Sequence, residues 1–335
     1  MTRILVTGAT GYVGARLVPA LLDAGHTVRV LTRSADRIAD REWVDRVEVV
    51  EGDADSRRSL DEALADVDVA YYLLHSMDGK ADFAERDAAL AHGFGLAAQR
   101  AGVGRLVYLS GLHPEGKLSE HLASRVEVGH LLMASGVPTI VLQAAIILGS
   151  GSASFEMLRH LTHRLPVMLT PKWVHNRIQP IAISDVLDLL VAAATLPGEL
   201  NRSFDIGCAE VVTYRELIHR YAAAAGLPRR AIVSAPVLTP KLASGWVSLV
   251  TPVPSGVAKP LVGSLVHEVV CREDDLSALV GRPRSAYVGI DEAIARALEG
   301  STPAEGRSAR PEPGVGVPEQ LTAADPDWAG GKDER

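Results

Sequence analysis

The sequence predicts an α/β fold, a Rossmann-type doubly wound parallel sheet with a smaller C-terminal substrate-binding part. Two observations carry this prediction. Apolar runs of strand length alternate with helical patterns over the first 150 residues, and the first run leads straight into a glycine-rich turn. Continuously apolar strands are typical of sheets whose two faces are both covered by helices. Beyond residue 150 the alternation weakens, which indicates a smaller part inserted after the later strands.

A turn that contains three glycines joins the first strand to the first helix. Residues 3–7 form an apolar run of strand character, and residues 15–24 have helical periodicity. Between them, Gly8 permits a tight turn, Gly11 lets a phosphate approach the backbone, and Gly14 lets the helix pack on the strand. The N–H groups and the positive dipole end of such a helix attract a dinucleotide pyrophosphate. The expected cofactor-binding residues of this turn are Gly8, Thr10, Gly11, Tyr12, Val13 and Gly14.

The later elements continue the alternation after Gly25 ends the first helix. The further strands expected in the sheet are residues 27–31, 47–50, 69–74, 105–109 and 139–142. The helices expected among them include residues 83–101 and 119–135, which end at Gly102 and Gly136. Beyond residue 150 we expect helices at 155–164, 184–195 and 214–225 and a short strand at 203–206.

Three regions follow from this pattern. Residues 1–150 should form an NAD(P)-binding Rossmann core. Residues 151–300 should hold the late Rossmann elements and a smaller substrate- or partner-binding part. Residues 301–335 are rich in Pro, Gly, Glu and Asp and lack periodicity, so we expect a disordered tail there.

The end of the second strand bears on the choice of dinucleotide. An acidic residue there would bind the adenosine ribose and select NAD, whereas a cation accommodates the 2′-phosphate of NADP. The strand ends with Arg33 and Ser34, and Arg37 follows. Arg33 could make a fork-like, charge-assisted contact with that phosphate. The sequence therefore favours NADP(H) over NAD(H), although NAD stays open if Arg33 is only a solvated arginine.

The next two strands end in residues that could also face a dinucleotide. Asp53 follows the third strand, where its carboxylate could reach the adenine amino group or simply cap an acidic loop. Leu74 and His75 end the fourth strand, at the carboxyl edge that faces the cofactor ribose. We therefore add Arg33, Ser34, Asp53, Leu74 and His75 to the expected cofactor-binding residues.

These motifs resemble the short-chain dehydrogenase/reductase superfamily, specifically its atypical NAD(P)H-binding members, which include NmrA-like and epimerase/dehydratase-like proteins. The resemblance rests on Thr-Gly-Ala-Thr-Gly-Tyr-Val-Gly at 7–14, Arg33, Gly-Asp at 52–53, Tyr-Tyr-Leu-Leu-His-Ser at 71–76 and Val-Tyr-Leu-Ser-Gly at 107–111. It covers roughly the first two hundred residues. It implies a Rossmann fold, a bound nicotinamide cofactor and, in catalytic members, oxidoreductase activity.

Catalytic members of this superfamily use a Ser together with a Tyr-x-x-x-Lys pair, in which the Tyr exchanges a proton with the substrate oxygen. Ser110 matches the serine, but His121 and Arg125 stand where the Tyr and Lys belong. The i, i+4 spacing places both on one helix face. A histidine with an ordinary pKa of about 6.5 could be the general acid, with Ser110 on the same oxygen and Arg125 on the ribose. Alternatively, His121 and Arg125 form a polar helix surface and the pocket only binds cofactor.

Three functions stay open at this point. The first is an NADPH-dependent reductase of a small apolar carbonyl or quinone-like substrate. The second, which the loss of the Tyr and Lys favours, is a non-catalytic NADP(H)-dependent redox sensor resembling NmrA-type regulators, or an accessory subunit resembling the nucleotide-binding one of respiratory complex I. The third is a nucleotide-sugar epimerase or dehydratase. The missing Tyr counts against it, because those reactions begin with a Tyr-assisted oxidation.

The composition limits the partners and the compartment. A net charge of −7 without a basic stripe argues against a nucleic-acid partner. Cys208 and Cys271 lie far apart without a C-x-x-C pair, so we expect neither a disulfide framework nor a metal site. The chain shows no secretory signal and no apolar stretch of about 18 residues. We therefore expect a cytoplasmic protein without a transmembrane segment.

Two further segments have patterns that allow more than one interpretation. Residues 242–270 are apolar but contain several prolines. They predict a pair of packed helices with a proline-rich turn, with a lid over an apolar substrate, a protein contact or a membrane-surface patch as alternatives. His160 and His163 lie with Arg159 and Arg164 on one expected helix, and this composition predicts a solvated face rather than a metal site.

Overall fold

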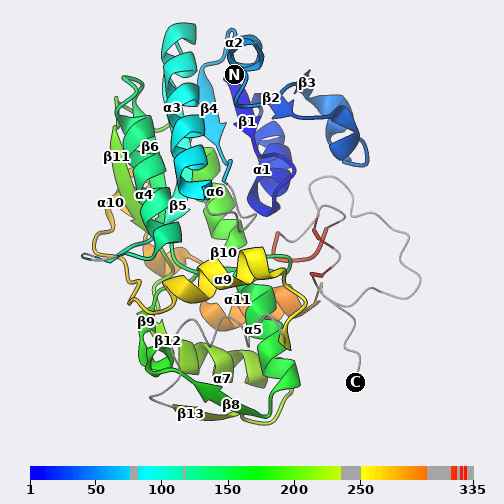
Figure 1. Ribbon diagram of the computed structural model, residues 1–335, viewed down its shortest axis with the longest axis vertical. Coiled ribbons are helices and arrows are strands. Elements are labelled where there is room, and N and C mark those ends of the chain that lie inside the picture. Colours follow the sequence, from blue (N-terminus) through cyan, green and yellow to red (C-terminus); the bar gives the residue numbers. More distant parts are fainter. Residues whose placement is uncertain are drawn as a thin grey trace.

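The core of the described part of the molecule is a parallel sheet, as the sequence predicts (Figure 1). It has seven strands, namely the six expected in the sheet and the short strand expected at 203–206, which joins it at one edge. The computed structural model describes residues 1–75, 82–114, 116, 118–234, 250–299, 318–322, 325–326 and 328–329. The strands are β1 (Arg3–Thr7), β2 (Thr27–Thr32), β3 (Glu48–Glu51), β4 (Val69–Tyr72), β5 (Arg105–Gly111), β6 (Thr139–Ala144) and β11 (Arg202–Ile206). Their order is β11-β6-β5-β4-β1-β2-β3. Because β2 and β4 flank β1, the strand order reverses there, and a ligand crevice is expected at the carboxyl ends of β1 and β4.

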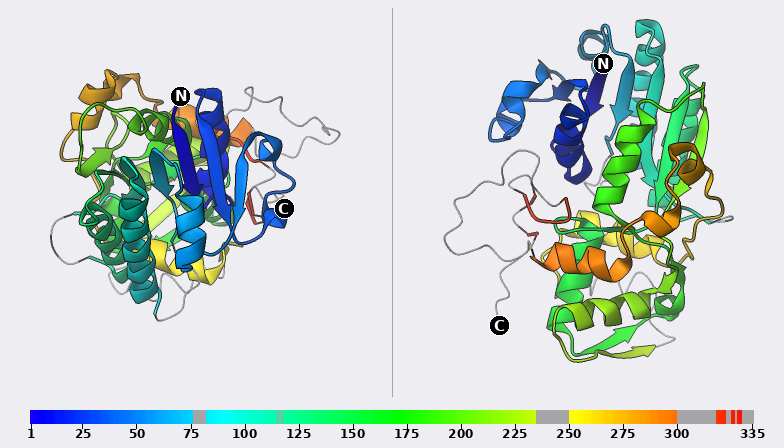
Figure 2. Two further views of the ribbon diagram at one scale, coloured as in Figure 1. Left: turned by 90° about the horizontal axis from the view of Figure 1, so that it is seen from above. Right: turned by 180° about the vertical axis from the view of Figure 1, so that it is seen from behind.

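Helices cover both faces of this sheet (Figures 1 and 2). They are α1 (Tyr12–Asp23) and α6 (Ile183–Ala193) on one face, and α2 (Arg57–Ala63), α3 (Phe83–Ala101) and α4 (Glu120–Met133) on the other. Successive side chains of a strand point to opposite faces. Accordingly Ile4 and Val6 of β1 belong to the apolar core beside α1 and α6, whereas Leu5 belongs to the core beside α2 and α3. A strand buried on both faces is mostly apolar along its whole length, which explains the continuous runs.

A smaller part lies where the parallel strands end (Figure 1). Its helices are α5 (Ala153–Arg164), α7 (Tyr214–Ala224), α9 (Ser255–Ser264) and α11 (Ile290–Glu299). A further helix, α10 (Asp275–Val280), packs instead on the sheet strand β11. The short strands of the smaller part pair as β7 (Ile147–Leu148) with β10 (Ile181–Ala182), β9 (Arg177–Ile178) with β12 (Val212–Thr213), and β8 (Val167–Thr170) with β13 (Ala231–Ser234). Helix α9 packs on α4 and α5, so it bridges the sheet and the smaller part.

Only residues 250–270 of the apolar segment 242–270 lie within the described part of the chain. Residues 242–249 lie outside the described residues. The remainder contains α9, with Val253, Ala258 and Val262 buried against Met157 of α5. Within the described ranges, no helix is long and apolar enough to cross a membrane.

The solvated face predicted for the helix at 155–164 is wrong. His160 is 6% exposed, Arg159 is 4% exposed and Glu156 is fully buried. The Glu156 carboxylate lies 3.6 Å from Arg159 Nε and 3.8 Å from His160 Nε2, and it accepts a hydrogen bond from Gly151 N. A polar face can be buried when its charges are paired, as Arg159 is with Glu156.

The predicted disordered tail also differs from the structure where it is described. Residues 300–317 lie outside the described residues, but residues 318–322, 325–326 and 328–329 are placed against the body of the molecule. Asp325 forms an ion pair of 2.7 Å with Arg16 of α1, and Glu319 is fully buried. These contacts hold a segment whose composition alone predicts disorder.

Candidate functional site

The glycine turn after β1 has the close backbone contacts that its sequence implies. Gly8 has φ of 74°, and a Cβ there would lie 2.6 Å from Leu73 O. A Cβ on Gly14 would lie 2.2 Å from Gly8 O, so α1 can approach the turn this closely only with glycine at that position. Gly11 caps α1 without supplying a side-chain acceptor. The first N–H groups of α1 therefore remain available to an anionic ligand.

Two cavities meet at this turn. One, of about 330 Å³, lies at the ends of β1, β2 and β3, and the other, of about 460 Å³, extends toward β5, α4 and α9. The residues that line both are Gly8, Gly11, Leu73, Leu74 and His75. A pair of cavities joined at a pyrophosphate-binding turn fits a dinucleotide, with adenosine in the smaller one and nicotinamide in the larger one. Of the other predicted turn residues, Thr10 lines the smaller cavity, and Tyr12, Val13 and Gly14 line the larger one.

The smaller cavity holds the side chains expected to select the cofactor. Arg33, Arg37 and Asp53 all line it, and all three are exposed. Among the described residues, neither arginine forms an ion pair, so both guanidinium groups are available to a phosphate. Ser34 does not line this cavity. Its Oγ instead accepts a hydrogen bond from Asp36 N and caps the short helix Ala35–Arg37.

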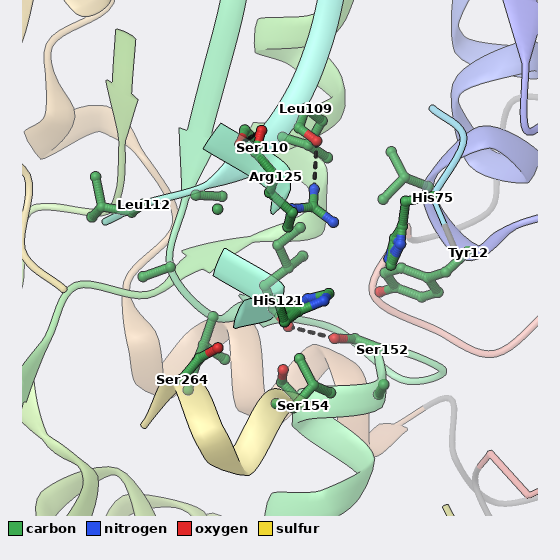
Figure 3. Close-up of a pocket in the computed structure, with 18 of the residues that line it drawn as sticks. Tyr12, His75, Leu109, Ser110, Leu112, His121, Arg125, Ser152, Ser154 and Ser264 are labelled. Atoms are coloured by element: carbon green, nitrogen blue, oxygen red, sulfur yellow. Dashed lines mark hydrogen bonds between the residues drawn. The ribbon is translucent and has the colours of Figure 1, made fainter. Parts of the chain in front are cut away.

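The larger cavity brings together the residues predicted to be catalytic (Figure 3). His121 and Arg125 both line it from one face of α4, as their spacing implies. The guanidinium of Arg125 donates from Nη2 to Leu109 O at 2.5 Å. Figure 3 shows this guanidinium, His121, His75 and Tyr12 around one space, and the His75 and His121 rings are 5.7 Å apart. Ser110 is 2% exposed, and its Oγ donates to Arg125 O at 3.3 Å.

The expectation of an ordinary pKa for His121 is wrong. Burial, together with the nearby Arg125 charge, lowers the pKa of His121 to about 4. Burial, Arg125 and His121 also hold the pKa of His75 well below its usual range. Both imidazoles are therefore neutral near pH 7, and each offers one N–H donor and one acceptor nitrogen.

Stability should fall as the pH is lowered through the range in which the unfolded histidines titrate. The folded-state pKa values of His121 and His160 are about 4, below the value of about 6.5 in an unfolded chain. Between these values the unfolded chain binds more protons, so stability that is present at neutral pH is lost toward pH 4. Urea unfolding across this range should show a smaller loss in His160→Gln than in the unaltered protein. Equal losses in the two proteins would contradict the assignment for His160.

The rest of the larger cavity is an apolar wall that the sequence did not identify. It includes residues of α4 and α9 and of the segments beside them and beside β5, among them Leu112, Leu122, Leu261, Leu265 and Val269. Two of its serines make hydrogen bonds within the protein. Ser152 Oγ donates to Ile147 O, and Ser264 Oγ bonds to Pro260 O and Ser119 Oγ. The available signal was the apolar segment 242–270, for which a lid over an apolar substrate was one interpretation.

Comparison with known sequences agrees with the geometry of this site. The sequence model of a family described as NAD(P)H-binding matches residues 8–137. The (4-alkanoyl-5-oxo-2,5-dihydrofuran-3-yl)methyl phosphate reductase of Streptomyces griseus subsp. griseus is 32% identical over 235 residues, which are 68% of this chain and 75% of that protein. The ceramide reductase of Caulobacter vibrioides is 29% identical over 200 residues, or 58% of this chain and 61% of that protein.

Solved structures with the same fold include two reductases. The triphenylmethane reductase of Citrobacter sp., complexed with NADP(H), superposes with a TM-score of 0.69 at 19% identity over 88% of this chain and 100% of that chain. An NADPH-dependent quinone oxidoreductase of Escherichia coli gives a TM-score of 0.67 at 17% identity, over 88% of this chain and 99% of that chain. At these identities the likeness concerns the fold.

Proposed function

Because this chain belongs to the atypical, NAD(P)H-binding branch of the short-chain dehydrogenase/reductase superfamily, we propose that it is an NADPH-dependent reductase of a small apolar carbonyl or quinone-like substrate. The larger cavity carries this proposal. It runs from the glycine turn past His121 and Arg125 to the apolar wall, so it offers space for a second molecule beside a nicotinamide. A mostly apolar pocket with a few polar groups is typical of small-molecule sites.

The choice of NADP(H) rests on the smaller cavity. Arg33 and Arg37 line it at the end of β2, where the 2′-phosphate of NADP would lie. Asp53, from the loop after β3, lines the same cavity and is assigned to the adenine. The glycine turn and the open start of α1 are assigned to the pyrophosphate, and Leu74 and His75 to the ribose beside it.

The polar groups of the larger cavity can polarise a substrate oxygen. When bound, the cofactor supplies a hydride from its nicotinamide. Arg125 contributes a fixed positive charge held by Leu109 O, and the neutral His121 ring can donate its N–H to the oxygen. Because Ser110 Oγ donates to the backbone carbonyl of Arg125, we assign Ser110 the task of holding this turn of α4 against β5.

This arrangement favours one kind of acceptor. A neutral imidazole is a poor proton donor, because giving up its proton would leave an anion. A positive charge and a hydrogen-bond donor can nevertheless stabilise a delocalised oxyanion, which takes its proton from water after the hydride has been transferred. We therefore favour quinones and conjugated carbonyls over simple ketones as substrates of this site.

Replacing His121 with phenylalanine should lower kcat by about 100-fold, because the donor to the developing oxyanion is lost. The Kd for NADPH should stay unchanged, since neither the glycine turn nor Arg33 is altered. His92→Phe is the matched control, because His92 is exposed on α3 and lines neither cavity. Steady-state rates with a quinone acceptor, measured beside NADPH titrations, make the comparison. Full turnover in His121→Phe would remove His121 from the mechanism.

The replacement of the usual Tyr and Lys favours one second function, a non-catalytic NADP(H)-dependent redox sensor or accessory subunit. His121 is neutral and Ser110 Oγ already donates a hydrogen bond to Arg125 O, and both features also fit a site that only binds cofactor. This alternative predicts tight NADPH binding with no oxidation of any acceptor. It also predicts a protein partner, for which residues 242–270 are one proposed contact.

A further inference from the structure

The described end of the chain lies against the first helix of the sheet. We call residues 318–322, 325–326 and 328–329 the C-terminal strap. Figures 1 and 2 show it, in red, beside α1 and the smaller part. Its placement follows from contacts with Arg16 and with the loop 149–152.

Arg16 is the main anchor of the C-terminal strap. Its Nε donates to Pro318 O at 3.0 Å, and its Nη2 donates to Gln320 O at 2.8 Å. The two Nη groups also meet both carboxylate oxygens of Asp325, at 2.8 and 2.7 Å. The side chains of Arg16 and Asp325 are 4% and 2% exposed. Such a two-pronged, buried pair fixes the strap in one orientation.

The loop 149–152 is the second anchor. Ser150 N donates to Glu319 O at 2.7 Å, and Ser150 O accepts from Arg16 Nη2 at 3.2 Å. A Cβ on Gly151 would lie only 2.4 Å from Asp325 Oδ1, so the carboxylate is packed directly on this loop. The loop is therefore held between α1 and the C-terminal strap.

Both anchors adjoin the larger cavity. The Arg16 guanidinium lies over the Tyr12 ring, 4.2 Å from its centroid, and Tyr12 lines the cavity. Ser152, at the end of the loop, lines it too. A Cβ on Gly149 would lie 2.4 Å from the Tyr12 hydroxyl, so the loop and the first turn of α1 also touch each other. Arg16 and Asp325 themselves line neither cavity.

We propose that Asp325 is a positioning residue of the dinucleotide site: through Arg16, the C-terminal strap holds the first turn of α1 and the loop 149–152 in the arrangement that binds NADP(H). Removing one partner of a buried ion pair leaves the other charge uncompensated, so Arg16 would move without Asp325. The coupling is reciprocal, because any strap contact that strengthens cofactor binding is itself strengthened by the cofactor. This inference requires NAD(P)H binding alone and is independent of the proposed reductase activity.

Two measurements on the full chain test the proposal. In Asp325→Asn the Kd for NADPH should rise about tenfold. The control is Asp275→Asn, which removes an exposed ion pair with Arg202, lines neither cavity and should leave the Kd unchanged. In the unaltered protein, NADPH should slow hydrogen exchange at the amides of Thr322 and Asp325, which are hydrogen-bonded within the strap. The exchange measurement needs no variant, so it decides the question even if Asp325→Asn fails to fold.

Two results would overturn the proposal. The first is an Asp325→Asn protein that unfolds at a lower temperature yet binds NADPH with the Kd of the unaltered protein. The second is a rate of hydrogen exchange at the strap amides that saturating NADPH leaves unchanged. Either result would reduce the C-terminal strap to a purely structural role.

Discussion

Gly14→Ala is expected to weaken NADPH binding by on the order of 100-fold, because the turn whose N–H groups meet the pyrophosphate must move, and each hydrogen bond to a charged group contributes about 1.5–3 kcal/mol. The new Cβ would meet Gly8 O at 2.2 Å, Gly8 C at 2.8 Å and Ala9 Cα at 2.9 Å. All three atoms belong to the backbone of the turn, so the turn itself must move. Overpacking of this kind also destabilises a protein by about 1–3 kcal/mol. NADPH titration and thermal unfolding measure the two effects.

A second helical glycine provides the matched control. Gly93 lies within α3, and a Cβ there would meet no atom within 4 Å. Gly93→Ala should therefore leave NADPH binding intact and stabilise the protein by about 0.5–1 kcal/mol, the usual gain from removing a glycine from a helix interior. If the two variants had the same Kd for NADPH, the close contact at Gly14 would not shape the site.

Arg33→Ala should weaken the binding of NADPH by about 10- to 100-fold, because a hydrogen bond to a charged group contributes about 1.5–3 kcal/mol. NADH lacks the 2′-phosphate, so its Kd should change little. The measurement is a titration with both cofactors, and the quantity of interest is the ratio of their Kd values.

Arg46→Ala controls for the loss of a surface charge. Arg46 pairs with Asp23 at 3.0 Å and lines neither cavity. The Arg46→Ala variant should therefore keep the ratio of the Kd values for NADPH and NADH unchanged. If Arg33→Ala weakened the binding of NADPH and NADH equally, the assignment of Arg33 to the 2′-phosphate would be wrong.

Most of the sheet and its helices could be predicted because their signals are local. The helix predicted at 83–101 has these bounds as α3, and Gly102 ends it with φ of 72°. The i, i+4 spacing alone placed His121 and Arg125 on one face of α4. The close approach of Gly14 to Gly8 O is also predictable from local sequence, because a strand, a tight turn and a helix must pack together within a few residues.

The features that the sequence could not predict depend on contacts between segments that are distant along the chain. Arg16 and Asp325 are 309 residues apart, and nothing near either residue predicts their ion pair. The neutral state of His121 arises from burial in the folded cavity together with the adjacent Arg125 charge. Arg159 and His160 belong to a polar pattern that usually faces solvent, but Arg159 has a buried partner in Glu156, and His160 is buried as a neutral imidazole.

The most direct test of the account is the consumption of NADPH, followed by the absorbance of the reduced nicotinamide, with a panel of quinones and conjugated carbonyls. NADPH binding is confirmed first, and His121→Phe is measured in parallel. At least one acceptor should be reduced as NADPH is oxidised, and His121→Phe should slow this reaction while still binding NADPH. Bound NADPH that no member of the panel oxidises would contradict the reductase proposal and favour the sensor.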